Sequence, residues 1–210
     1  MSGSPGPRLR YLALGDSYTI GERVEPAGRW PLQLAQALRA DGIDLDDPQI
    51  IATTGWTTDE LSAGIDAAAP SGRFDLVSLL IGVNNQYRGR PLDEYRAQFD
   101  GLLERAIGFA GGRADRVLVL SIPDWGTTPF ARQSGRDRDL VARELDVFNA
   151  AAHEACAERA VAFVNITAHG RAHRADPSIL ADDGLHPSAA AYAAWARLAQ
   201  PVARRLLSPP

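Results

Sequence analysis

Short hydrophobic runs recur along the chain, and the first four are each followed by a loop rich in Gly, Ser, Thr, Asn or Asp. The runs are continuous rather than alternating, which is typical of parallel strands that are buried on both faces. The strongest run, Asp75 to Ile81, is apolar at nearly every position. The pattern predicts five strands, at residues 11–14, 49–53, 75–81, 116–122 and 161–166.

Between these runs, hydrophobic residues recur at steps of three and four, which is the spacing of one helix face. The clearest example extends from Leu92 to Phe109 and ends at Gly111 and Gly112. The same spacing predicts helices at residues 30–40, 59–69, 92–109, 137–160 and 189–207. We expect loops at residues 82–89 and 123–129, and an irregular polar segment at residues 167–182.

Strands that alternate with helices predict an α/β protein with a parallel sheet. With right-handed crossovers, the natural architecture is a flavodoxin-like five-stranded parallel sheet. No internal repeat or long linker interrupts the pattern, so we expect residues 9–210 to form a single domain. The polar, Gly- and Pro-rich residues 1–8 are expected to form a flexible leader.

The composition narrows the classes of function. The 210 residues are 45% hydrophobic, the net charge is −4, and no dense Lys/Arg cluster is present, which argues against a nucleic-acid-binding protein. No apolar run approaches the roughly 20 residues of a membrane span, and no signal-peptide pattern is present, so we expect a cytoplasmic protein without membrane insertion. Cys156 is the single cysteine, which excludes a disulfide within the chain. The sequence does not indicate an oligomeric state.

Polar loops follow the predicted strands at the edge of the sheet where parallel α/β proteins bind ligands. Four of them are Gly15-Asp16-Ser17, Thr54-Gly55-Trp56, Gly82-Val83-Asn84-Asn85 and Pro123-Asp124-Trp125. A later loop, Asp183-Gly184-Leu185-His186, follows the last strand at a distance. We therefore expect residues from these loops to meet at one edge of the sheet.

The residue types in these loops are those that acyl transfer uses. A serine hydroxyl is a weak nucleophile until a base takes its proton, and histidine, oriented by a carboxylate, is a suitable base. Ser17 is the candidate nucleophile, and the short spacing from Asp183 to His186 allows one loop to present both partners. The backbone N–H groups of Ser17 and Gly55 and the side-chain amide of Asn84 are candidate donors to an oxyanion. Taken alone, Ser17 is equally compatible with a helix cap.

Other residues compete for these roles. His153 lies within a predicted helix, where packing or exposure is the simpler interpretation. His169 and His173 lie in the polar segment and are interpreted as loop residues. Asp182 is a neighbouring carboxylate that we interpret as a loop residue or a cap.

The four blocks resemble those of the GDSL/SGNH hydrolase superfamily, which is named for a Ser, a Gly, an Asn and a His in separate blocks. Gly15-Asp16-Ser17-Tyr18 is similar to the first block, Gly55 to the second, Gly82-Val83-Asn84-Asn85 to the third, and Asp183-Gly184-Leu185-His186 to the last. The resemblance implies a three-layer α/β/α fold and hydrolysis of esters or thioesters through an acyl-serine, without a metal or an organic cofactor. It also implies the triad Ser17, Asp183 and His186, and an oxyanion hole at Ser17, Gly55 and Asn84. Tyr18 and Asn85 depart from the usual leucine and aspartate.

Four residues that directly follow strand-end motifs are candidates for a substrate pocket, and ordinary packing is the alternative for each: Trp56, Tyr87, Arg88 and Trp125. The expected substrate is a small-molecule ester with a short acyl group, because no large inserted lid is evident. Thioester hydrolysis, carbohydrate deacetylation and acyl transfer at the same site remain open. A flavodoxin-like binding protein without catalysis is the alternative from another class, although it gives no role to Asp183 and His186.

Overall fold

The computed structural model describes residues 8–208, and its centre is one parallel β-sheet. The strands are β1 (Tyr11–Gly15), β2 (Gln49–Ala52), β3 (Leu76–Leu80), β4 (Val117–Leu120) and β5 (Ala162–Val164). Their order in the sheet is β2-β1-β3-β4-β5, the order of flavodoxin-like folds. The predicted fold class is therefore confirmed.

Strand β3 is the central strand and β1 is one of its two neighbours, and all residues of both strands are buried. They pair in register from Tyr11 opposite Leu76 to Gly15 opposite Leu80. Burial on both faces explains why these runs are apolar at successive positions. The pairing of β1 with β3 places their ends side by side, so the loops after Gly15 and Leu80 start from neighbouring points.

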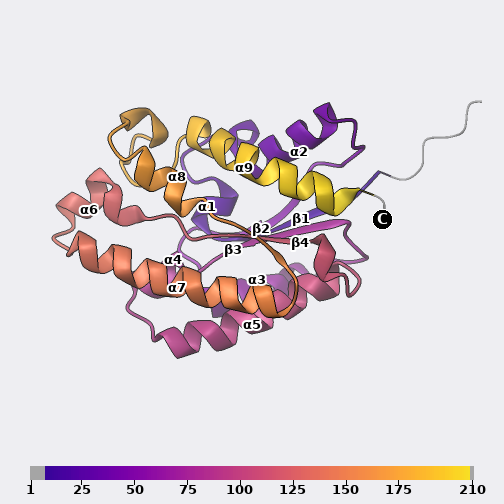
Figure 1. Cartoon of the computed structure of the whole chain (residues 1–210), viewed down its shortest axis with the longest axis horizontal. Coiled ribbons are helices and arrows are strands. Elements are labelled where there is room, and N and C mark those ends of the chain that lie inside the picture. Colours follow the sequence, from indigo (N-terminus) through magenta and orange to yellow (C-terminus); the bar gives the residue numbers. More distant parts are fainter. Residues whose placement is uncertain (1–7, 209–210) are drawn as a thin grey trace, which may run out of the picture.

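Helices cover both faces of the sheet and make the structure a three-layer sandwich (Figure 1). Helices α2 (Trp30–Ala40) and α9 (Ala189–Leu207) pack against each other on one face. Helices α3 (Thr58–Ala68), α5 (Leu92–Phe109) and α7 (Arg138–Glu158) lie on the other.

Short helices occupy segments that the hydrophobic pattern predicts to be loops or irregular. The segment 167–182, expected to be irregular, contains α8 (Thr167–Ala172) and the 3₁₀ turn η4 (Pro177–Ile179). The expected loop at 82–89 contains α4 (Val83–Tyr87), and the segment after β4 forms η3 (Trp125–Thr127) and α6 (Pro129–Gln133). These helices are too short to show a hydrophobic period, which is why the pattern missed them.

The remaining short elements connect the main ones. They are α1 (Ser17–Ile20) and the 3₁₀ turns η1 (Pro26–Gly28) and η2 (Ala114–Arg116). Of the predicted leader 1–8, residues 1–7 lie outside the described residues, and the Arg8 guanidinium pairs with the Asp44 carboxylate. Among the helices of residues 8–208, none has the length and hydrophobicity required to cross a bilayer.

Candidate active site

A cavity of about 210 Å³ lies at the carboxyl edge of the sheet. Its walls come from the loops after β1, β2, β3 and β4 and from the loop before α9. The residues that line it are Ser17, Tyr18, Thr54, Gly55, Val83, Asn84, Tyr87, Trp125, Phe130, Leu185 and His186. The structure thus brings Ser17, Gly55, Asn84 and His186 to one cavity, although they are far apart in the sequence.

Ser17 is the first residue of α1, directly after β1. Asp16 caps this helix, because its Oδ1 accepts a hydrogen bond from the Tyr18 N–H at 3.0 Å. The turn from strand to helix is tight: a Cβ atom on Gly15 would lie 2.2 Å from Thr19 Oγ1. A residue with a side chain at position 15 would therefore displace the helix that carries Ser17. As the first residue of a helix, Ser17 also has a backbone N–H without an intrahelical acceptor.

His186 is held by Asp183 within a single short loop. Asp183 Oδ2 lies 2.6 Å from His186 Nδ1, and Asp183 Oδ1 accepts hydrogen bonds from the N–H groups of Leu185 and His186, each at 2.9 Å. Partial burial of Asp183 opposes ionisation, but the bonds from the His186 ring and the two N–H groups outweigh it and lower the pKa of the carboxyl. An ionised carboxylate on Nδ1 fixes the proton there and leaves Nε2 as the basic nitrogen.

Tyr18 packs beside the histidine. Its ring centroid lies 5.9 Å from that of His186 and 6.0 Å from that of Trp195 on α9. An aromatic side chain therefore lies between the loop that carries His186 and α9.

The loop after β2 presents Gly55 to the cavity. Gly55 has φ = 88°, a left-handed conformation that favours glycine. Its carbonyl accepts a hydrogen bond of 2.6 Å from Arg88 Nη2, and its N–H donates to no protein group within residues 8–208. The backbone N–H of Gly55 is therefore available to a ligand.

Asn84 Nδ2 donates a hydrogen bond of 2.8 Å to the Trp56 carbonyl. That bond uses one of its two amide hydrogens and ties α4 to the Gly55 loop. The second hydrogen remains for a group in the cavity, since Asn84 is one of the lining residues.

Asn85 is fully buried and points the other way, toward the start of α3. Its Oδ1 accepts from the Thr58 N–H at 3.1 Å, and its Nδ2 donates to Thr58 Oγ1 at 2.8 Å. The Thr58 hydroxyl in turn donates to Gln98 Oε1. Asn85 therefore anchors the start of α3.

Aromatic side chains form much of the cavity wall. Tyr87 packs edge-on against Trp125 with their ring centroids 5.3 Å apart, and Phe130 lies 6.1 Å from Trp125. Phe130 was not among the predicted pocket residues; it enters the wall through α6, which the hydrophobic pattern did not reveal.

Two of the predicted pocket residues, Trp56 and Arg88, do not line this cavity. The Trp56 indole packs against Gly64 of α3. Arg88 donates to the Gly55 carbonyl and to Glu60 Oε1, and so supports the Gly55 loop from outside.

The other histidines lie away from Ser17. His153 packs on Phe163 with their ring centroids 5.0 Å apart, and His173 Nδ1 lies 2.8 Å from the His169 carbonyl. His169 lines a separate, smaller cavity. In the part of the chain that the structure describes, no group of three or more His, Cys, Asp or Glu side chains is arranged to hold a metal ion.

Solved structures of similar fold were identified. The chain resembles the crystal structure of TesA with a TM-score of 0.74 and 18% identity, covering 94% of this chain and 99% of that one. It resembles the lipase/acylhydrolase from Enterococcus faecalis with a TM-score of 0.68 and 20% identity, covering 96% and 98%. For Axe2, an acetylxylan esterase from Geobacillus stearothermophilus, the TM-score is 0.70 and the identity 21%, covering 93% and 94%. No curated protein matches the chain.

These likenesses establish that the chain shares the fold of these proteins. The sequence is more specific: the chain belongs to the GDSL-like Lipase/Acylhydrolase family, whose model matches residues 13–194. The predicted family is thereby confirmed, and membership supports an esterase-type hydrolase acting on small molecules.

Proposed function

We propose that the protein hydrolyses carboxylic esters through an acyl intermediate on Ser17. The observation that carries the proposal is the cavity itself, which is lined by Ser17, His186, Gly55 and Asn84 from four separate loops. Two further observations support it. Asp183 Oδ2 lies 2.6 Å from His186 Nδ1, and the lining residues Ser17 and Gly55 have backbone N–H groups that donate to no protein group within residues 8–208.

In the first half of the reaction, His186 Nε2 takes the proton of the Ser17 hydroxyl as the oxygen attacks the ester carbonyl. The carbonyl oxygen gains negative charge, and the Ser17 N–H, the Gly55 N–H and Asn84 Nδ2 donate hydrogen bonds to it. Asp183 stabilises the imidazolium that forms. The tetrahedral intermediate then collapses, His186 gives its proton to the leaving alcohol, and the acyl group remains on Ser17.

In the second half, His186 takes a proton from water, and the resulting hydroxide attacks the acyl-serine. The same donors hold the second oxyanion. When this intermediate collapses, Ser17 regains its proton from His186 and the carboxylic acid leaves. No cofactor takes part in these steps.

The size and character of the cavity favour small substrates. Its volume is about 210 Å³, and apolar and aromatic side chains dominate the wall beyond the catalytic groups. A short acyl chain fits such a space and gains from burial against Val83, Tyr87 and Phe130.

An acetylated carbohydrate is a second candidate substrate. The acetylxylan esterase from Geobacillus stearothermophilus shares the fold, and an acetyl group is a small acyl group of the kind that a cavity of about 210 Å³ accommodates. A panel of para-nitrophenyl esters and acetylated xylo-oligosaccharides separates the two substrate classes.

Labelling with a fluorophosphonate probe tests the mechanism, since the probe reacts only with an activated serine. We expect the wild-type chain to be labelled at Ser17, and Ser17→Ala to lose both labelling and hydrolysis of para-nitrophenyl acetate. Ser62→Ala, on α3 away from the cavity, is the matched control and keeps both. Absence of labelling in the wild-type chain, or hydrolysis retained in Ser17→Ala, would overturn the proposal. A binding protein without catalysis would give the first of these results.

A further inference from the structure

Trp125 separates the proposed ester cavity from a second cavity. The second cavity has a volume of about 50 Å³ and lies toward α8 and α9. Three residues line both spaces: Tyr18, Trp125 and Leu185. Trp125 is the largest of the three, is only 2% exposed, and contributes to the lining of both cavities.

Aromatic packing and a hydrogen bond both hold the Trp125 ring. Its aromatic neighbours Tyr87 and Phe130 make edge-on contacts with it. The directional contact is a hydrogen bond: Trp125 Nε1 donates to Gln86 Oε1 at 2.8 Å. Gln86 lies on α4, between the oxyanion candidate Asn84 and the wall residue Tyr87, and is itself only 2% exposed.

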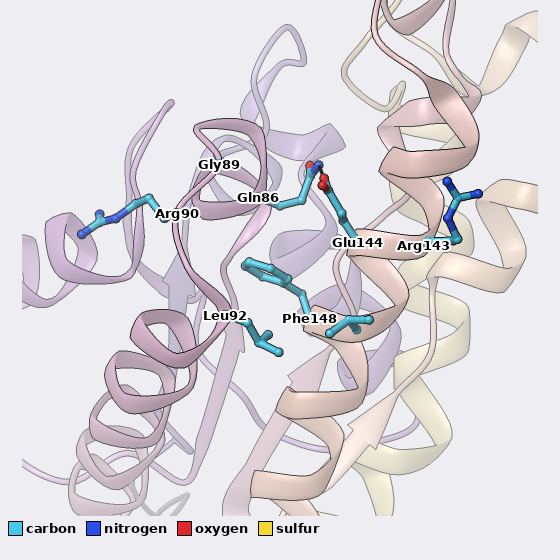
Figure 2. Close-up of a pocket in the computed structure, with 8 residues that line it drawn as sticks. Gln86, Gly89, Arg90, Leu92, Arg143, Glu144 and Phe148 are labelled. Atoms are coloured by element: carbon cyan, nitrogen blue, oxygen red, sulfur yellow. Dashed lines mark hydrogen bonds between the residues drawn. The ribbon is translucent and has the colours of Figure 1, made fainter.

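Glu144 of α7 determines which way the Gln86 amide faces. Gln86 Nε2 donates to Glu144 Oε2 at 2.7 Å, and Figure 2 shows the two side chains pointing toward each other across a groove between α4 and α7. A carboxylate only accepts hydrogen bonds, so it requires the nitrogen of the amide on its side. The amide oxygen must then face the indole N–H. A flipped amide would lose both bonds.

We propose that Gln86, oriented by Glu144, is the positioning residue that holds Trp125 as the end wall of the acyl cavity and thereby limits the length of the acyl chain. This inference rests on the proposed function. It adds a specificity determinant outside the catalytic groups. Glu144, the last residue in this series of hydrogen bonds, lies in a groove of about 340 Å³ that Gln86 also lines. When the bond to Gln86 is lost, the indole loses its directional contact, and a small displacement of the ring toward the second cavity lengthens the acyl cavity.

The test compares kcat/KM for para-nitrophenyl octanoate with kcat/KM for para-nitrophenyl acetate. Gln86→Leu leaves the buried indole N–H without an acceptor, and we expect the octanoate-to-acetate ratio to rise on the order of tenfold. Glu144→Ala, at a half-buried position, frees the Gln86 amide and should also raise the octanoate-to-acetate ratio, but by less. Arg96→Ala, which removes an exposed pair between α5 and α7, leaves the ratio unchanged.

A double-mutant cycle shows whether the effect passes through the indole N–H. Trp125→Phe keeps an aromatic ring but has no N–H, so it should raise the ratio itself, and Gln86→Leu should add nothing in that background. An unchanged ratio in Gln86→Leu, or an equal further rise in the Trp125→Phe background, would overturn the inference. If Gln86→Leu does not fold, as judged by circular dichroism, Glu144→Ala and Trp125→Phe decide the question, and an unchanged ratio in both overturns it.

The wild-type chain separates this inference from the function on which it rests. Labelling of Ser17 and hydrolysis of the acetate ester by the wild-type chain, with unaltered ratios in the variants, would refute only the role of Gln86. A wild-type chain that is not labelled and hydrolyses no ester would refute the proposed function, and the inference with it.

Discussion

Asp183 contacts both the ring and the backbone of His186. One carboxylate oxygen lies 2.6 Å from Nδ1, and the other accepts the His186 N–H at 2.9 Å. The carboxylate therefore fixes the imidazole orientation and the turn that carries it at the same time. Removal of its charge should affect the base more than the fold, because an asparagine can still accept the backbone N–H groups.

We expect Asp183→Asn to lower kcat for ester hydrolysis by about 10³–10⁴-fold with little change in KM. The neutral amide neither stabilises the imidazolium nor enforces the Nδ1 proton. Steady-state kinetics with para-nitrophenyl acetate measure the effect, and circular dichroism checks the fold. Asp182→Asn is the matched control, since this exposed neighbour should keep wild-type kinetics. A similar loss of kcat in both variants would show that the effect comes from a disturbed loop and not from loss of the Asp183–His186 ion pair.

Asn84→Ala tests the oxyanion donor. Loss of one donor that acts chiefly in the transition state should lower kcat by about 10²–10³-fold and leave KM nearly unchanged. The side chain also bonds the Trp56 carbonyl, so thermal unfolding is measured alongside. If the loss appears in KM instead of kcat, Asn84 binds the ground state and is not an oxyanion donor.

Asn85, the adjacent asparagine, should contribute to stability rather than to catalysis. Asn85→Ala leaves the buried Thr58 N–H without its acceptor, and we expect a loss of about 1–3 kcal/mol in the free energy of unfolding. Asn85→Asp retains that acceptor but places a carboxyl at a fully buried position, so at neutral pH it should also lower the free energy of unfolding. Urea denaturation measures both. Equal stability of Asn85→Ala and the wild-type chain would show that this bond does not anchor α3.

The sequence was most informative about the sheet and the family. Continuous apolar runs predict strands because a parallel sheet buries both faces, and the polar residues after each run predict which loops share an edge. His186, Asn84, Gly55 and Ser17 could be expected at one edge for that reason, even though their distances could not.

The walls of the site were less predictable. Tyr87 and Trp125 line the cavity, whereas Trp56 packs on α3 and Arg88 bonds the Gly55 carbonyl, although each follows a strand-end motif. Proximity in sequence does not determine the direction of a side chain in a loop. Phe130 could not be expected at all, because it reaches the cavity through tertiary packing of a helix too short to show a period.

The buried carboxyl of Asp16 should make stability depend on pH. Complete burial raises the pKa of Asp16 to about 7. The hydrogen bond from the Tyr18 N–H lowers this pKa but does not offset the effect of burial. Between the ordinary pKa of 3.8 and about 7, the folded chain retains a proton that the unfolded chain has lost, so this carboxyl makes the fold less stable as pH rises through that window.

Asp16→Asn removes this titration while its side-chain oxygen can still accept the Tyr18 N–H. Relative to the wild-type chain, we expect the variant to gain up to about 4 kcal/mol in the free energy of unfolding between pH 4 and pH 7, and nothing further at higher pH. Urea denaturation of both proteins at a series of pH values measures the difference. A difference that is constant across the series would mean that Asp16 has the same pKa in the folded and unfolded chains. Its carboxylate would then be hydrated or hydrogen-bonded in solution.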